Sequence, residues 1–136
     1  MRIGDMLVER SFKMNMFLIV LQVLVALGLL NVWLIRREKG TEYRGGNAHS
    51  MREEFAVYGL PAWSMYLVGG LKILAAICLI AGIWMHALIL PASVVLIVLM
   101  IGALAMHLRV SDPAKKSLPA VMLLIASGLI GWGAIR

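Results

Sequence analysis

Four long apolar runs, separated by short polar segments, dominate the pattern of the chain. They cover about residues 14–35, 60–84, 87–108 and 118–135, and each is long enough for a helix to cross a hydrocarbon core about 30 Å thick. The link between the second and third runs is so short that these two helices must be antiparallel neighbours. The pattern therefore predicts an all-α membrane protein, an antiparallel bundle of four transmembrane helices in which residues 1–136 form a single domain.

The longest polar segment, residues 36–59, separates the first two runs and also has a pattern of its own. The sequence of residues 50–53, Ser-Met-Arg-Glu, fits the capping box S-x-x-E and predicts the start of a short interfacial helix. Just before it, Gly45 and Gly46 tolerate positive φ angles and are followed by Asn47. These three residues predict a sharp turn or a nest of backbone N–H groups that could hold an anion.

Two arrangements of residues 36–59 fit this pattern. The short helix could lie on the bilayer as an amphipathic surface helix. Alternatively, the whole segment could fold over the mouth of the bundle as a lid. A lid would place several polar side chains above the space between the helices, namely Tyr43, Arg44, Asn47, Glu53 or Glu54.

A single charged residue, Lys72, interrupts the second apolar run at its centre. With a rise of about 1.5 Å per residue, its ammonium group starts roughly 18 Å from either end of the helix. A charge at that depth costs about 2.5–3.5 kcal/mol on insertion scales. We therefore expect Lys72 to point inward, either in a structural ion pair or at a ligand or proton site, with Glu53 or Glu54 as a possible partner in both cases.

Other polar residues of the spans give weaker signals. Gln22 and Asn31 face opposite sides of the first predicted helix, so at least one of them is expected to meet another helix or a cavity. His86 and His107 lie at opposite membrane faces, about 31 Å apart along one helix, and cannot share a haem or a metal within a monomer. His107 and His49 fall on the same side, but two histidines do not make a metal motif.

Composition and charge restrict the class of protein. The hydrophobic content of 62% and the mean hydropathy of +0.91 are typical of a polytopic membrane protein, whose partner is the lipid bilayer. The net charge of +6 could suit nucleic acid, but the basic residues flank the apolar runs, so we expect no nucleic-acid partner. Cys78 is the only cysteine, which excludes an intramolecular disulfide or a C-x-x-C redox pair.

Basic residues are distributed unevenly between the two predicted membrane faces. Residues 36–59 and 109–117 together carry more Lys and Arg than the two ends of the chain. The positive-inside rule then predicts that both of these loops are cytoplasmic and that both termini lie outside. The compartment expected for such a protein is the bacterial inner membrane.

Several stretches resemble the DoxX-like family of small four-helix membrane proteins: NVWLIR, TEYRGGNA, MREEFAVYGLPAW, LVGGLKILAAICLIAGIW and, more loosely, AMHLRVSDPAKKSLPA. The resemblance implies a four-helix architecture, similar in fold to bundles that bind sterols and other small ligands. It also implies a link to quinone or thiol redox biology, although this chain lacks the cysteines of a thiol-handling protein. The residues in the matching motifs are Tyr43, Arg44, Gly45, Gly46, Asn47, Glu53, Lys72 and His107.

Three functional hypotheses follow. The first is a binding module in which an intramembrane pocket around Lys72, capped by residues 36–59, takes an amphiphilic or anionic molecule such as a quinone or a lipid. The second is an accessory or assembly subunit of a membrane redox complex without a ligand of its own. The partner of the chain could instead be a second copy of itself in a homo-oligomer, which would count against this second hypothesis. A quinone-linked oxidoreductase ranks last, because the sequence contains no complete cofactor motif and no metal or haem motif.

Overall fold

The computed structural model describes residues 2–136, and this part of the chain is helical without strands. Its helices are α1 (Ile3–Leu30), α2 (Met51–Val57), α3 (Ala62–Ala81), α4 (Ile89–Arg109) and α5 (Leu118–Ile135). All except α2 are long and apolar enough to cross a membrane. The predicted fold class is therefore confirmed, including the short helix between the first two spans.

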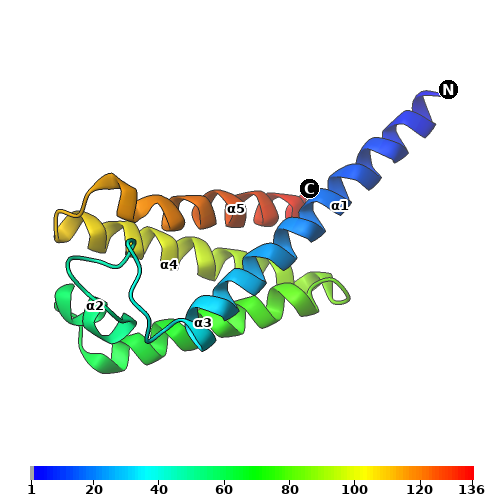
Figure 1. Cartoon of the computed structure of the whole chain (residues 1–136). Helices are drawn as coiled ribbons and strands as arrows, with labels where there is room; N and C mark the ends of the chain where they lie inside the picture. The colour runs from blue at the N-terminus through cyan, green and yellow to red at the C-terminus, as the bar shows by residue number, and fades with distance from the viewer. Residues whose placement is uncertain (1) are drawn as a thin grey trace.

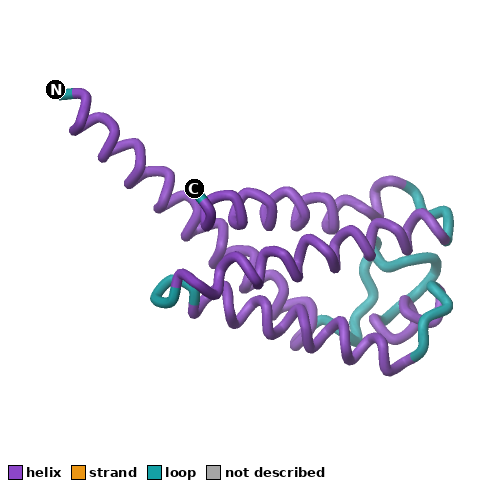
Figure 2. Tube along the Cα trace, turned by 180° about the vertical axis from the view of Figure 1, so that it is seen from behind, coloured by secondary structure: helices purple, strands orange, loops and turns teal. Residues whose placement is uncertain are grey.

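The long helices alternate in direction, as short connections require. Helices α3, α4 and α5 run side by side, and α1 crosses them at an angle (Figure 1). The loop that contains α2 lies at the same end of the bundle as the α4–α5 connection, as both views show (Figures 1 and 2). The two termini lie toward the opposite end (Figure 1).

Helix α1 is longer than a bilayer requires. It continues through a π-helical turn, Asn31–Ile35, so that the helical segment has 33 residues. At about 1.5 Å per residue it is roughly 50 Å long, whereas the hydrocarbon core is about 30 Å thick. The sequence pattern placed the first span at residues 14–35, but the helix begins at Ile3, and its N-terminal part projects beyond the bundle (Figure 1).

The central core is built from aliphatic and small side chains of all four long helices. Its most buried members are Ala26, Ala76, Leu79, Leu96 and Ile130. One polar contact crosses this core, where the amide of Gln22 donates to the backbone carbonyl of Leu79. Gln22 therefore has the interhelical role expected of an amide in a membrane span.

Helix α2 attaches the long loop to the bundle. Its N-cap, Ser50, accepts a hydrogen bond from the backbone N–H of Glu53, as the capping box predicts. It ends at Val57, and the φ of +76° at Gly59 lets the backbone N–H groups of Gly59 and Leu60 return to carbonyls of α2. Phe55 on its buried side packs edge-on against Trp33, with ring centroids 6.4 Å apart.

Candidate functional site

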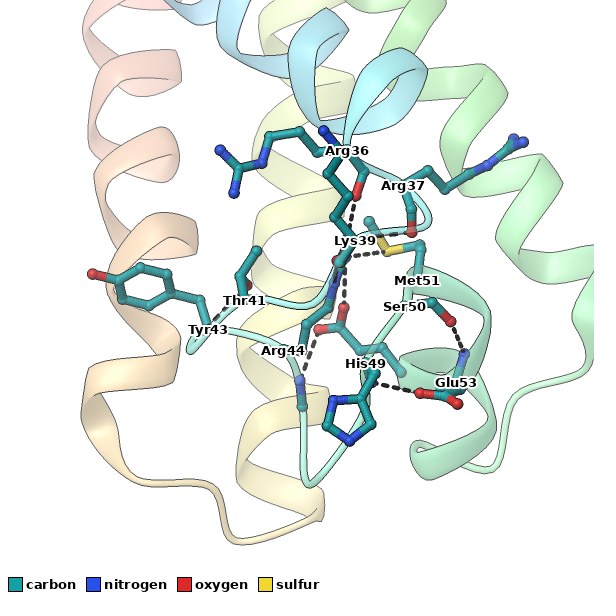
Figure 3. A network of polar contacts seen from close by, with 12 residues as sticks. Arg36, Arg37, Lys39, Thr41, Tyr43, Arg44, His49, Ser50, Met51 and Glu53 are labelled. Atoms are coloured by element: carbon teal, nitrogen blue, oxygen red, sulfur yellow. Dashed lines mark hydrogen bonds and ion pairs between the residues drawn. The ribbon is translucent and has the colours of Figure 1, made fainter.

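Arg44 is the centre of a polar network that orders residues 36–59 (Figure 3). Its side chain is buried, and its guanidinium donates to three backbone carbonyls, those of Arg36, Arg37 and Lys39. It also forms an ion pair of 3.2 Å with Glu54. Because these contacts fill the fork of donors, Arg44 serves the fold of the loop.

The carboxylate of Glu54 accepts hydrogen bonds from three groups. One carboxylate oxygen accepts from the backbone N–H of Gly45 at 3.1 Å and from the phenol of Tyr58 at 2.7 Å. The other oxygen faces Arg44. These donors supply hydrogen-bond partners to both oxygens of the buried carboxylate. Glu54 is thus fully engaged by its own segment of the chain.

The network then crosses to the α4–α5 connection. The phenol oxygen of Tyr58 lies 3.5 Å from Nε2 of His107, whose Nδ1 lies 2.7 Å from a carboxylate oxygen of Asp112. The other oxygen of Asp112 accepts from the backbone N–H of Gly46 at 2.9 Å. The ammonium of Lys116 donates to the carbonyl of Gly46 and lies 3.8 Å from Asp112. Two loops that are distant in sequence therefore form one polar unit.

The charge states of this unit follow from its contacts. Burial alone would raise the pKa of Asp112, but hydrogen bonds from His107 and Gly46 and the charge of Lys116 hold that pKa below its ordinary value. Burial and the neighbouring carboxylate of Glu54 raise the pKa of Tyr58. Asp112 is therefore an anion and Tyr58 a neutral hydrogen-bond donor at physiological pH.

Glycine is required at two adjacent positions, 45 and 46, for different structural reasons. A Cβ atom on Gly45 would lie 2.5 Å from the ring of Tyr58, so no larger residue fits there. Gly46 has a φ of +54° and faces a side chain of Val57. The backbone N–H groups that the sequence suggested as an anion nest do hold anions, but these are the chain's own carboxylates, Glu54 and Asp112.

A cavity of about 890 Å³ lies beneath this loop, within the range of sites for small molecules. Its walls come from the end of α1, the loop of residues 36–59, and helices α2, α3, α4 and α5. Most of the side chains in these walls are apolar, such as Val68, Leu99, Met106 and Leu123. The cavity therefore joins an apolar interior to a polar roof.

Lys72 lines this cavity from α3. Its ammonium group lies 5.2 Å from the centre of the Trp33 ring, a distance at which a cation is attracted to an aromatic face. Among the carboxylates that the structure describes, none pairs with Lys72, because Glu54 faces Arg44 and Glu53 accepts from the backbone of His49. In the described part of the chain, the cavity wall thus carries a lysine that lies within ion-pair distance of no carboxylate.

Trp33 is held in place by the shape of α3. The indole is 3% exposed, and a Cβ atom on Gly69 would lie 2.6 Å from its six-membered ring. The small residues near Lys72 could have indicated either a close helix contact or space for a ligand. At Gly69 the structure places an aromatic side chain from α1.

The predicted site residues separate into three groups. Lys72, Asn31, Tyr43, Arg44, Glu54 and His107 line the cavity. Gly45 and Gly46 support the loop behind it. Asn47 and Glu53 are exposed and outside the lining, with Glu53 acting at the start of α2. Figure 3 shows that Tyr43 points away from the network around Arg44.

Sequence reasoning missed Trp33, Tyr58 and Asp112 as parts of the site. Tyr58 and Asp112 appeared only inside stretches that resemble the family, MREEFAVYGLPAW and AMHLRVSDPAKKSLPA. Asp112 reaches His107 because the intervening Ser111 adopts a left-handed conformation, with a φ of 56°. The one signal that could have drawn attention to Asp112 is its spacing of five residues from His107.

Comparison with known proteins extends these observations. The model of the DoxX-like family matches residues 46–129. An uncharacterized protein of Bacillus subtilis (strain 168), YdgD, is 32% identical over 83 residues, which cover 60% of this chain and 73% of that protein. No solved structure matches. The matched region contains Lys72, His107 and Asp112, whereas Arg44 precedes it.

Proposed function

The chain belongs to the DoxX-like family, and from this premise we propose that it is a binding module whose cavity around Lys72 takes an amphiphilic molecule, a quinone or an anionic lipid. The family match confirms the resemblance seen in the sequence. The helices long and apolar enough to span a bilayer make it a membrane protein. The bound molecule and its role are our proposal.

One observation carries the proposal: the ammonium of Lys72 lines a largely apolar cavity and pairs with none of the described carboxylates. A charge in a membrane interior is costly and is normally offset by a partner. A carbonyl, phosphate or carboxylate oxygen would supply hydrogen-bond acceptance or opposite charge at this position. The apolar walls would hold the hydrocarbon part of the same molecule.

The remaining charges of the cavity favour an electron-rich head group. Glu54 is neutralised by Arg44, and Glu42 pairs with Lys115 at 2.8 Å. Arg36 also lines the cavity and is exposed. The surplus of positive charge fits an oxygen-bearing or anionic head and disfavours a cationic ligand.

The test is retention of endogenous molecules by protein purified in a mild detergent. We expect native mass spectrometry and solvent extraction to find a bound quinone or anionic phospholipid. Added ubiquinone analogue or phosphatidylglycerol should raise the melting temperature. Lys72→Met should lose both signals, while the matched control Lys13→Met, which removes a lysine 73% exposed on α1, should keep them.

Failure of this test has a clear form. If the purified protein carries no such molecule and neither compound raises its melting temperature, the binding function is wrong. If it also co-purifies with a redox protein, the alternative of an accessory subunit of a membrane redox complex gains support. Equal retention by Lys72→Met and the parent protein would place any bound molecule elsewhere.

We further propose the bacterial inner membrane as the location, with residues 36–59 and 109–117 on the cytoplasmic side. The support is the distribution of basic residues along the sequence. A Cys78→Ala background allows single cysteines to be placed at exposed positions, Asn47 in the loop and Arg136 at the C-terminus. A membrane-impermeant maleimide added to intact cells should label the Arg136→Cys protein, and labelling of Asn47→Cys instead would reverse the orientation.

A further inference from the structure

Exposed residues of the apolar helices also line the cavity, among them Gly28, Val32, Val98 and Gly102. Gly28 and Val32 belong to the end of α1, and Val98 and Gly102 belong to α4. The side chain of Val32 is 38% exposed and that of Val98 is 61% exposed. Because these residues lie on apolar spans, their exposed faces contact the hydrocarbon of the bilayer. The cavity therefore reaches the lipid through the side of the bundle.

The course of α1 explains part of this opening. Near the end with the termini, α1 packs against α5, where Leu18 fills the space beside Gly133. Toward the other end it packs against α3, where Trp33 lies over Gly69. Figure 1 shows the same crossing of α1 from α5 toward α3. The end of α1 therefore diverges from α5, and the cavity lies where the two helices separate.

On the aqueous side of the cavity, buried polar contacts hold the roof in place, while Arg36 and Glu42 of the same wall are exposed. Arg44 and Tyr58 are each 5% exposed, and the carboxylate of Glu54 in α2 accepts hydrogen bonds from Arg44 and from the backbone N–H of Gly45, which joins the loop to α2. The contact between Gly46 and Asp112 joins the same loop to the α4–α5 connection. Opening this roof would break several buried polar contacts, each of which costs free energy when it is left unpaired.

We infer that the ligand enters the cavity sideways from the bilayer leaflet next to the loop, past Gly28 and Gly102. This inference rests on the proposed function of the cavity. Gly28 precedes Arg36 by about two helical turns, which places it roughly 12 Å into the membrane. The molecules that can use this route share one chemistry, a long apolar chain with an oxygen-bearing head, and both a quinone and an anionic phospholipid have it.

The two glycines provide a direct way to narrow the opening. A Cβ atom added at Gly28 or Gly102 would have no neighbouring atom within 4 Å, so a side chain can begin at either position without a clash. Gly70 and Gly128 have the same open surroundings but do not line the cavity. The variant Gly28→Phe/Gly102→Phe therefore has a matched control in Gly70→Phe/Gly128→Phe.

The experiment uses the full-length protein reconstituted in phosphatidylcholine vesicles. In one arm phosphatidylglycerol with a diazirine in the acyl chain is added to these vesicles, and in the other arm a benzoquinone with a diazirine in its isoprenoid tail is added. Photolysis at increasing times after addition, followed by peptide mapping, measures the initial rate at which cavity residues are labelled. We expect labelling in at least one arm, and the arm that labels identifies the source of the ligand.

The labelling rates are compared among the parent protein, the two pairs of glycine variants and Lys72→Met. Gly28→Phe/Gly102→Phe should lose most of the initial labelling rate, and the control pair should keep the parent rate. If both pairs label like the parent, or both lose labelling equally, the sideways route is wrong. The Lys72→Met variant tests the binding function separately. If labelling survives both this change and the glycine changes, the cavity is not where the ligand binds.

Discussion

The imidazole of His107 and the carboxylate of Asp112 lie 2.7 Å apart, and this contact joins the last turn of α4 to the connection that leads into α5. Asp112 also accepts from the backbone of Gly46, so the same carboxylate holds the loop of residues 36–59 in place. The phenol of Tyr58 continues the network on the other side of His107. The polar network over the cavity therefore joins the loop of residues 36–59 to the connection between α4 and α5.

Acidification should destabilise the fold by weakening the contacts of Asp112 with His107 and Gly46. Its pKa in the folded protein lies below the unfolded value of about 3.9, so its contribution to stability is complete above that value and is lost as the pH falls through the folded pKa. Asp112→Asn should be less stable at neutral pH by about 1.5–3 kcal/mol, the range for a hydrogen bond to a charged group. Equilibrium unfolding as a function of pH measures the difference.

The difference in unfolding free energy between Asp112→Asn and the parent protein should depend on pH. The gap in unfolding free energy between this variant and the parent should close as the pH falls below about 4. Glu42→Gln, which removes an exposed carboxylate paired with Lys115, serves as the control and should change stability little. A gap that stays constant down to pH 2 would show that the carboxylate charge of Asp112 is not what stabilises the fold.

Removal of Arg44 should be among the most damaging changes in the loop. Arg44→Met leaves Glu54 as a buried charge without its partner, which typically costs about 3–5 kcal/mol. The double variant Arg44→Met/Glu54→Leu should recover part of the loss, because the unpaired charge is removed as well. Unfolding in mixed detergent micelles and proteolysis of residues 36–59 measure both effects. Equal losses for Arg44→Met and the exposed Lys115→Met would contradict a structural role for Arg44.

Packing over Gly69 can be tested with a neighbouring glycine as the control. Gly69→Ala places a Cβ atom against the indole of Trp33 and should destabilise the protein by about 1–3 kcal/mol, the usual cost of overpacking. Gly70→Ala meets open space and should stabilise the helix by about 0.5–1 kcal/mol. Thermal unfolding of the two variants in the same detergent distinguishes them, and similar shifts would exclude close packing by Trp33.

In the ligand-free protein, the ammonium of Lys72 should lower the free energy of unfolding, although we propose that it binds the ligand. Lys72→Met replaces an unpaired ammonium by an apolar side chain of similar length, so stability should rise by at most about 2.5–3.5 kcal/mol. Lys72→Ala should gain less, because it also removes apolar stem atoms. Unfolding of the ligand-free proteins measures this. A loss of stability in Lys72→Met would instead make the lysine a structural contact, dominated by its position over Trp33.

The sequence by itself determined the class of fold and the location of the charged position in its core. Continuous apolar runs of about 20 residues fit helices, which satisfy their backbone hydrogen bonds within one segment, so the four spans could be predicted without tertiary information. The start of α2 was also predictable, because the cap of Ser50 depends on atoms three residues away. The same local logic placed Lys72 at mid-membrane.

Only the tertiary structure decided which residues surround the cavity. Gly46 and Asp112 are 66 positions apart, and Tyr58 and His107 are 49 apart, so their contacts depend on how the helices pack. The sequence offered Glu53 and Glu54 as partners for Lys72, but the packing of the loop gives Glu54 to Arg44. Local periodicity specifies which face of a helix is apolar, whereas the angle at which α1 crosses its neighbours depends on side-chain shapes from several helices together.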